Sequence, residues 1–236
     1  MTDLARSDTP LAARIVTTAP DVATSTNLGG WVSQRGVFGL ATRPDALRAN
    51  QVVSMQKWDV SPRGQHIELG IAENNLFLML AGASRPRSTR NNCQRSLTLR
   101  HAVWIAACLR AALGLSAPLF GQRLLPIGTL YDPFISRGLD ALNYACYQDS
   151  RFLLVATPSG ITLAPEGGAH QSIYTPSIGM GQPNLTYYEP AYADELAVTM
   201  REAFGAYLAS FAGGKSCRHH QQSQWRAWSL GVPIQN

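Results

Sequence analysis

The chain has 236 residues, of which 45% are apolar and 15% are charged. This length allows one large domain or two small ones with a real hydrophobic core, and this composition excludes a disordered chain. The net charge of +5 comes from residues 84–110 and 213–236. The rest of the chain has 11 basic and 15 acidic residues. We therefore do not expect a uniform basic face of the kind that binds nucleic acids.

The first third of the chain predicts short strands separated by irregular structure. Residues 14–18, RIVTT, form a β-branched run that is typical of a strand. The loop that follows contains Asp21 and is rich in Ser, Thr, Asn and Gly, which favours a helix start within it. Residues 36–63 show no steady period, which indicates irregular structure with a short helix near 44–49. Residues 65–69, QHIEL, return to strand character.

This strand leads into a predicted amphipathic helix within the stretch GQHIELGIAENNLFLML, residues 64–80. The spacing of Leu76 and Leu80 places both on the face that would pack against a core. Glu73 lies in the first turn, where the helix dipole favours a carboxylate. From the spacing alone, Glu73 therefore fits a residue that starts a helix.

The second half predicts strands and helices in alternation. Residues 123–131 form an apolar strand, and residues 132–148 follow as a helix with Pro133 in its first turn. Residues 151–159 are a nearly continuous apolar run, which is typical of a strand buried on both faces of a parallel sheet. A Gly-rich loop, TLAPEGGAHQSIYTP, then precedes an amphipathic helix over residues 190–211.

This order of elements predicts an α/β fold with three layers, α/β/α, and a mostly parallel sheet. In such a fold, ligands bind at the loops that follow the carboxyl ends of the strands. The four Cys show no metal-ligand spacing, so we expect reduced thiols in a cytoplasmic protein. We expect no signal peptide, because the N-terminus lacks an apolar region, and no membrane span, because Arg110 interrupts the most apolar window.

The two basic segments differ in composition from the rest of the chain. Residues 84–110 interrupt a helix-to-strand connection that would otherwise need only a few residues. Residues 213–236 contain His219 and His220, but no second pair of ligands at a metal-binding spacing. Three interpretations are open: arms for nucleic acid or a membrane surface, lineage-specific loops, or translation of out-of-frame or unspliced DNA. The loss of acids and of periodicity favours the third.

Four long phrases carry a resemblance to a known family: VTTAPDVATSTNLGGW, GQHIELGIAENNLF, RLLPIGTLYDPFISRGLDALNYACYQD and LVATPSGITLAPEGGAHQSI. They resemble the pyrimidine-binding domain of thiamin-diphosphate enzymes of the transketolase superfamily, and within it homodimer-type pyruvate dehydrogenase, the decarboxylating first component, and its transketolase-like relatives. The resemblance implies the pyrimidine-binding fold of that family over residues 1–212, interrupted at 84–110. It fails over residues 213–236, which we expect to be an aberrant or disordered tail without the family's last strand.

The resemblance implies that Glu73 is both a catalytic and a cofactor-binding residue. In the family, an acid at this place forms a hydrogen bond with N1′ of the aminopyrimidine ring and drives the ring to its imino tautomer. The 4′-amino group of the cofactor can then take the proton from the thiazolium carbon, which is general acid–base work done through the cofactor.

The resemblance also assigns roles to five other residues. Tyr131 and Phe134 would stack on the pyrimidine ring, although strand-end and helix-start packing explains them equally well without the family. Asp21 would lie near the cofactor, and it fits a helix cap as well. Glu166 and His170 would face the substrate, where His170 would orient a 2-oxo acid carboxylate or transfer a proton.

Finally, the resemblance implies cofactors and partners. The family holds thiamin diphosphate and Mg²⁺ with a further domain that carries a GDG motif, and this chain contains no GDG. We therefore expect the chain to be the pyrimidine-binding portion of a pyruvate dehydrogenase or transketolase-like enzyme. The enzyme would be an oligomer, and it would be incomplete without a diphosphate-binding domain. We expect this portion to bind no nucleic acid, no membrane and no metal of its own. The alternative is a non-catalytic folded fragment of a degraded or truncated gene that binds no cofactor alone.

Overall fold

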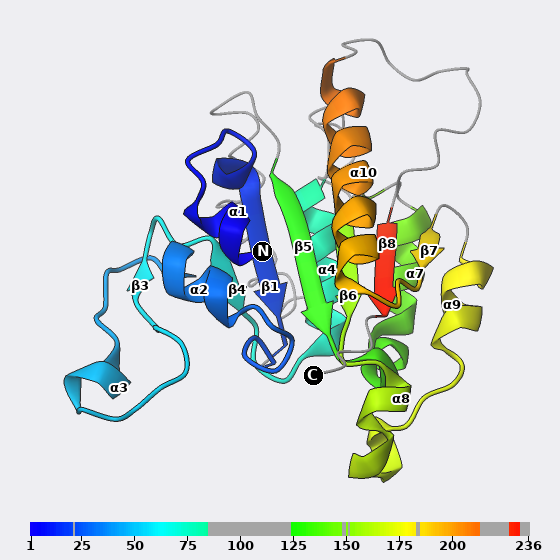
Figure 1. Cartoon of the computed structure of the whole chain (residues 1–236), viewed down its shortest axis with the longest axis horizontal. Helices are drawn as coiled ribbons and strands as arrows, with labels where there is room; N and C mark the ends of the chain where they lie inside the picture. The colour runs from blue at the N-terminus through cyan, green and yellow to red at the C-terminus, as the bar shows by residue number, and fades with distance from the viewer. Residues whose placement is uncertain are drawn as a thin grey trace, which may run out of the picture.

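One eight-stranded sheet organises the fold (Figure 1). The computed structural model describes residues 1–20, 22–84, 124–147, 150, 152–182, 185–212 and 227–231 of the sequence. The strands are β1 Ile15–Ala19, β2 Val37–Phe38, β3 Val60–Ser61, β4 His66–Glu68, β5 Leu125–Leu130, β6 Phe152–Ala156, β7 Thr186–Tyr188 and β8 Ala227–Gly231. Their order is β3-β2-β4-β1-β5-β6-β8-β7, and every neighbouring pair is parallel. All carboxyl ends therefore lie at one edge of the sheet.

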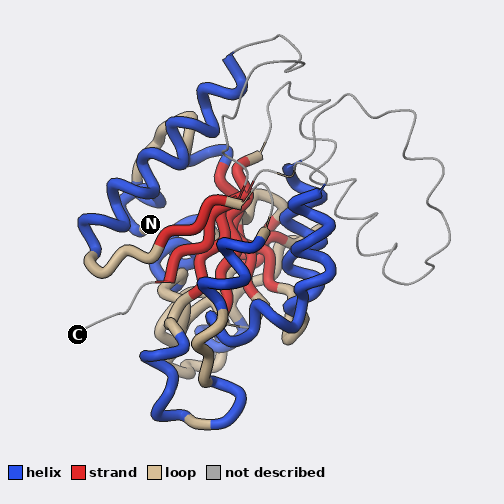
Figure 2. The backbone as a smooth tube through the Cα atoms, turned by 90° about the vertical axis from the view of Figure 1, so that its right-hand side faces the viewer, coloured by secondary structure: helices blue, strands red, loops and turns tan. Residues whose placement is uncertain are grey.

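Helices cover both faces of this sheet. The α-helices are α1 Thr2–Arg6, α2 Gly29–Arg35, α3 Ala46–Ala49, α4 Glu73–Ser84, α7 Leu139–Tyr147, α8 Gly160–Leu163, α9 Thr175–Gly181 and α10 Ala193–Ala212. The 3₁₀ helices are η1 Ala12–Arg14, η5 Asp132–Gly138, η6 Ala164–Glu166 and η7 Gly168–His170. Helices α1, α2 and α10 lie on one face, and α4 and α7 lie on the other (Figures 1 and 2). The predicted α/β/α arrangement with a parallel sheet is confirmed.

Two of the three apolar cores that the described residues form lie on opposite faces of the sheet, beneath its main helices. The core beneath α4 and α7 contains Leu76, Phe77, Leu80, Leu130, Leu142 and Leu154, all buried. The core on the opposite face contains Ile15, Trp31, Leu125, Ile127, Leu153 and Ala203, also buried. Successive residues of a strand point to opposite faces, which is why β6 serves both cores. Strands β5 and β6 are covered on both sides, as their continuous apolar character predicts.

Most predicted elements are present, with one helix divided in two. The strands predicted near residues 14–18, 65–69, 123–131 and 151–159 are β1, β4, β5 and β6. The helix predicted over residues 132–148 begins instead as the 3₁₀ helix η5, in which the Phe134 N–H donates to the Tyr131 carbonyl at 2.9 Å. Pro133, which has no N–H to donate, lies in this first turn.

The expectation that the tail supplies no strand is wrong for its last part. Ala227–Gly231 forms β8, which lies between β6 and β7 and is parallel to both. The short segment AWSLG follows polar residues and has no clear alternation, so its pattern alone does not predict a strand. The segment is a strand because its backbone pairs with two neighbouring strands. Residues 85–123, 213–226 and 232–236 lie outside the described residues, so the proposed boundaries of the domain and its interruption remain predictions.

An arm extends from the sheet between β2 and β3 and carries α3 (Figure 1). Asp45 holds it together, since its carboxylate accepts hydrogen bonds from the backbone N–H groups of Trp58 at 2.9 Å and Leu47 at 2.9 Å. These bonds, the one from Trp58 above all, keep the pKa of Asp45 below its ordinary value. Leu40, Val53 and Met55 on the arm are almost fully exposed.

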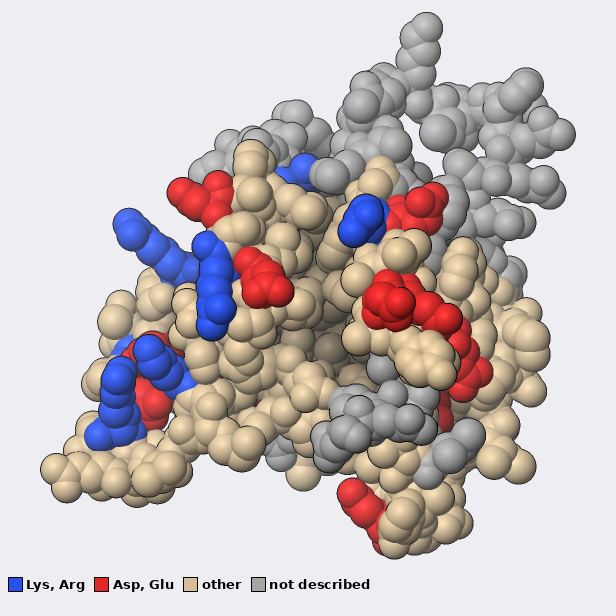
Figure 3. Space-filling view, in the orientation of Figure 1, with Lys and Arg blue, Asp and Glu red and all other residues tan. Residues whose placement is uncertain are grey.

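A groove of about 430 Å³ separates α1 from α10, where Figure 3 shows the surface hollowed. Its walls are mostly apolar: Met1, Leu4, Leu11, Ala197, Met200, Arg201, Phe204 and Gly205. None of the residues predicted for the site line it. Among the helices that the structure describes, none has the length and apolar character required to cross a membrane.

Candidate active site

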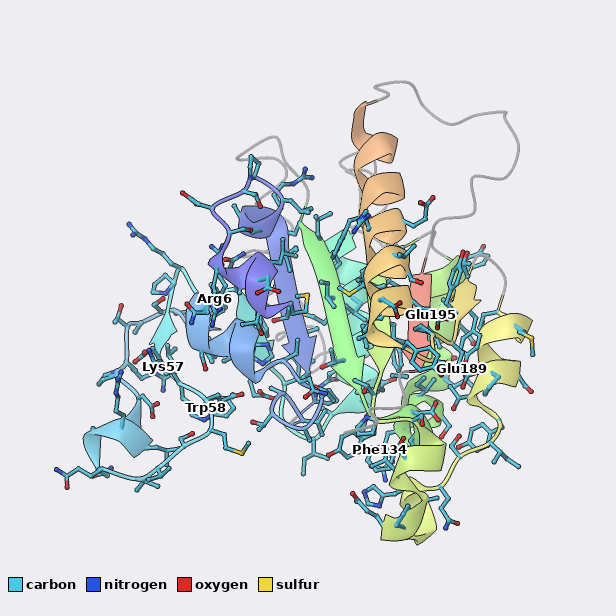
Figure 4. The ribbon with its side chains drawn as sticks, viewed as in Figure 1. Arg6, Lys57, Trp58, Phe134, Glu189 and Glu195 are labelled. Carbon is cyan, nitrogen blue, oxygen red and sulfur yellow. The ribbon has the colours of Figure 1, made fainter. Side chains whose placement is uncertain are left out.

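Five of the predicted site residues lie at the carboxyl edge of the sheet, in segments that follow three different strands. Glu73 follows β4, Tyr131 and Phe134 follow β5, and Glu166 and His170 lie in the segment after β6. Phe134 is labelled in Figure 4, at the lower edge of the sheet beside α8. Because these strands are parallel and near one another in the sheet, residues far apart in sequence meet at this edge.

Glu73 is the first residue of α4 and is almost fully buried, with 9% of its side chain exposed. The N–H groups of the first turn of α4 make this a favourable position for a carboxylate. Its partner is Arg137, whose Nη1 donates to Glu73 Oε1 at 3.1 Å. Among the described residues, no hydrogen bond reaches the second carboxylate oxygen, Oε2.

Gly138 lets η5 approach α4 closely enough for this ion pair. A Cβ atom at Gly138 would lie 2.4 Å from Cδ2 of Phe77 and 3.1 Å from Cα of Asn74. Both neighbours belong to the first turns of α4, immediately after Glu73. The absence of a side chain at this one position therefore brings Arg137, the preceding residue, to the carboxylate.

Three rings from the segments after β5 and β6 gather at the carboxyl edge of the sheet. The ring centroids of Tyr131 and Phe134 are 5.7 Å apart, and those of Phe134 and His170 are 5.3 Å apart. The Tyr131 and His170 rings complete the triangle at 6.2 Å. All three pairs are tilted rather than stacked face to face, a geometry that aromatic pairs favour. The structure thus brings the predicted aromatic pair and the predicted histidine together.

Arg137 is a site residue that the sequence analysis missed. Its guanidinium carbon lies 3.8 Å from the centroid of the Phe134 ring, and the same group binds Glu73. Its spacing of three residues from Phe134 is a helical signal that places the two on one face. The contact with Glu73, 64 positions away in sequence, has no such local signal.

Glu166 and His170 face each other across a tight turn. His170 Nε2 lies 3.6 Å from Glu166 Oε2, and their side chains are 33% and 58% exposed. A pair this exposed adds little to stability. The turn depends on Gly167 and Gly168, whose φ angles of 73° and 53° favour glycine. The tight turn of the backbone and the neighbouring rings therefore set the position of His170.

Asp132 ties the aromatic segment to the segment that carries His170. This buried carboxylate accepts a hydrogen bond from the Gly160 N–H at 2.8 Å, and the Thr175 hydroxyl donates to the Asp132 carbonyl at 3.4 Å. Burial, followed by the charges of Glu189 and Asp132, raises the pKa of the nearby Tyr187 phenol. Asp132 thus holds the loops after β5 and β6 side by side.

The loop after β1 reaches the site through two hydroxyl contacts. The Tyr131 phenol donates to Ser25 Oγ at 2.7 Å, and the Thr26 and Thr129 hydroxyls are 2.8 Å apart. Asp21, predicted to lie near the cofactor, is outside the described residues. Its role remains a prediction.

A second buried polar cluster, also missed, lies on β1 and β4. The fully buried His66 places Nδ1 2.9 Å from Thr17 Oγ1 and Nε2 3.1 Å from Glu68 Oε2. The spacing of His66 and Glu68 by two residues puts both on one face of a strand, a signal that was available in the sequence.

The chain is similar in sequence to a pyruvate dehydrogenase component. It is 29% identical over 199 residues to the protein named pyruvate dehydrogenase E1 component of Pseudomonas aeruginosa. The match covers 83% of this chain and 19% of that protein, so the chain spans about a fifth of the length of this relative. No family model matches the chain.

A solved transketolase shares the fold. The transketolase of Campylobacter jejuni has a TM-score of 0.51 and 14% identity, over 94% of this chain and 23% of that one. The transketolase of Leishmania mexicana has a TM-score of 0.47 and 17% identity, over 93% of this chain and 22% of that one. The first of these likenesses concerns the fold alone. The similarity to the curated relative confirms the resemblance to pyruvate dehydrogenase.

Proposed function

We propose that this chain forms the pyrimidine-binding part of a thiamin-diphosphate-dependent enzyme. The complete enzyme would decarboxylate a 2-oxo acid such as pyruvate, or transfer a two-carbon unit as a transketolase does. One observation carries the proposal: a single guanidinium, that of Arg137, contacts both Glu73 and the ring of Phe134. The carboxylate and the aromatic ring therefore border the same space. Similarity to the E1 component supports the reaction class.

The residues present fit the aminopyrimidine half of the cofactor. Such a ring has flat π faces and a ring nitrogen that shares a proton with a carboxylate. Phe134 and Tyr131 offer aromatic surfaces, and Glu73 offers an oxygen that no described residue engages. When bound, thiamin diphosphate supplies a nucleophilic thiazolium carbon.

Glu73 has the central role in this proposal, as the group that holds the proton at N1′ of the ring. It lies at a helix start with the apolar core of Leu76 and Phe77 behind it. This arrangement keeps water from the carboxylate on that side, which suits proton transfer between fixed partners. His170, on the exposed side of the aromatic cluster, would face the substrate together with Glu166 and orient its carboxylate or transfer a proton.

The diphosphate and Mg²⁺ are proposed to be held by another domain or subunit. This chain has no GDG motif, and it spans 19% of the length of its curated relative. The partner we propose is therefore a diphosphate-binding domain of the same enzyme, joined in a homo- or hetero-oligomer in the cytoplasm. The site would be shared between the two parts.

Reconstitution tests this proposal. The chain is mixed with a protein that supplies the diphosphate-binding domain, and the decarboxylation of a 2-oxo acid is measured with thiamin diphosphate and Mg²⁺. Glu73→Gln should lower the rate by about 10²- to 10⁴-fold, the usual contribution of a general acid–base group. Glu202→Gln, an exposed residue of α10, is the matched control and should leave the rate unchanged. Full activity in Glu73→Gln would contradict the role assigned to this residue.

The competing function is a folded domain without catalysis. Calorimetry with thiamin diphosphate and Mg²⁺ separates the two, with one titration of the chain alone and one with the partner domain present. Heat of binding that appears with the partner and depends on Glu73 supports the enzyme. Heat in neither titration supports the non-catalytic fragment.

A further inference from the structure

Arg137 lies where the two contacts proposed for the cofactor ring converge. Its guanidinium covers one face of Phe134, 3.8 Å from the ring centroid, and its Nη1 donates to Glu73 Oε1 at 3.1 Å. A ring that stacks on this same face of Phe134 and forms a hydrogen bond with Glu73 Oε1 would lie between these two side chains. The guanidinium stands in that place.

The guanidinium also resembles such a ring chemically. It is planar and delocalised, it stacks on aromatic faces, and it donates N–H groups to carboxylates. An aminopyrimidine protonated on its ring nitrogen has the same three properties. Arg137 therefore satisfies Phe134 and Glu73 in the manner expected of the ligand.

We propose that Arg137 competes with the aminopyrimidine ring for the space between Phe134 and Glu73, and that it swings away when the ring binds. This inference rests on the proposed function. With 45% of its side chain exposed, Arg137 can move its charged head into water while its stem remains on η5. Because Glu73 is almost fully buried, the departing guanidinium has to be replaced by another N–H donor. The site thus selects flat rings that carry a donor over flat apolar rings.

The affinity for the ring is reduced by the fraction of molecules in which Arg137 has moved away. A cation–π contact and a partly exposed ion pair of ordinary strength together correspond to about a 3- to 30-fold change in this equilibrium. Removal of the guanidinium should strengthen ring binding by that factor. A residue that only positioned Glu73 would have the opposite effect when removed.

The test uses the full chain and the isolated aminopyrimidine alcohol that forms one half of thiamin. This probe needs no diphosphate-binding domain, and its Kd is measured by NMR titration. Arg137→Ala should bind the probe about 3- to 30-fold more tightly than wild type. Arg201→Ala, an exposed arginine of α10, is the matched control and should bind like wild type. In protein labelled at arginine, the Arg137 Nε–H signal should move as the probe saturates the wild-type site.

Each outcome separates this inference from the proposed function. If wild type binds the probe and Arg137→Ala binds it equally or more weakly, competition is refuted and the pyrimidine-binding function stands. If neither protein binds the probe, the competition is refuted, and the calorimetry with the partner domain decides the pyrimidine-binding function separately. If circular dichroism shows that Arg137→Ala is unfolded, Arg137→Met replaces it in the test, because methionine keeps an apolar stem and removes the ion pair. An Arg137 signal unchanged at saturation would overturn the inference in the wild-type protein itself.

Discussion

Replacement of Gly138 by alanine should loosen the contact between η5 and α4. The new Cβ would lie 2.4 Å from Cδ2 and 2.6 Å from Cε2 of Phe77, whereas carbon atoms in contact prefer about 3.5–4.0 Å. Phe77 is completely buried in the core, so its ring has no free space to enter. The segment around Gly138 therefore has to retreat by roughly 1 Å, the difference between these distances.

Two effects of opposite sign set the magnitude. Overpacking of a filled core costs about 1–3 kcal/mol, while replacing glycine by alanine in a helical backbone contributes about 0.5–1 kcal/mol of stability. We expect Gly138→Ala to lower the free energy of unfolding by about 1 kcal/mol, the difference between these terms. The retreat of η5 should also lengthen the 3.1 Å contact between Arg137 and Glu73 beyond hydrogen-bond range.

Urea unfolding followed by circular dichroism measures the first effect, and the Arg137 Nε–H signal measures the second. Gly205→Ala is the control, because Gly205 lies in α10 with no neighbour within 4 Å of an added Cβ atom. That variant should gain about 0.5–1 kcal/mol. If Gly138→Ala gained as much as Gly205→Ala, the close approach of η5 to α4 would not control the position of Arg137, and the reasoning would be refuted.

Other perturbations test the rest of the fold. Burial raises the pKa of the Cys146 thiol to about 11, so above pH 9 the folded chain keeps a proton that the unfolded chain loses. The free energy of unfolding should therefore fall as pH rises from about 9 to 11. Urea titrations of Cys146→Ala should lack this part of the pH dependence. Asp45→Ala removes the acceptor of the Trp58 N–H, so hydrogen exchange at that amide should accelerate, and unchanged exchange would contradict the role of Asp45 in the arm. Because the pKa of Asp45 is lowered, its contribution to stability should be lost only as pH falls below about 4. Deletion of residues 213–236 should lower the urea midpoint by removing β8, and an unchanged midpoint would show that β8 adds nothing to the sheet.

The main strands and the position of Glu73 were predictable because their signals are local. The apolar run at β6 reflects burial on both faces, and Pro133 marks the start of η5 after β5. Phe134 and His170 could be assigned to one site only through the family resemblance. Their centroid distance of 5.3 Å is consistent with that assignment, but their exact roles remain proposals.

Features created by tertiary contacts were beyond local patterns. The pairing of Arg137 with Glu73 depends on the close approach of two helices at Gly138, which no spacing in either helix encodes. Strand β8 has a short and mixed sequence, and it is a strand because β6 and β7 supply its hydrogen bonds. The division of the helix after β5 follows from the packing of η5 rather than from helix propensity.

The position of β8 has a consequence for how the chain is made. It is the last strand in the described sequence, yet it lies inside the sheet, between β6 and β7. Until it arrives from the ribosome, β6 presents an apolar strand with an open edge, and β7 has no neighbour to pair with. Exposed edges of this kind recruit other chains. Synthesis that stalls after α10 should therefore yield aggregates, and completion of the sheet should depend on Ala227–Gly231.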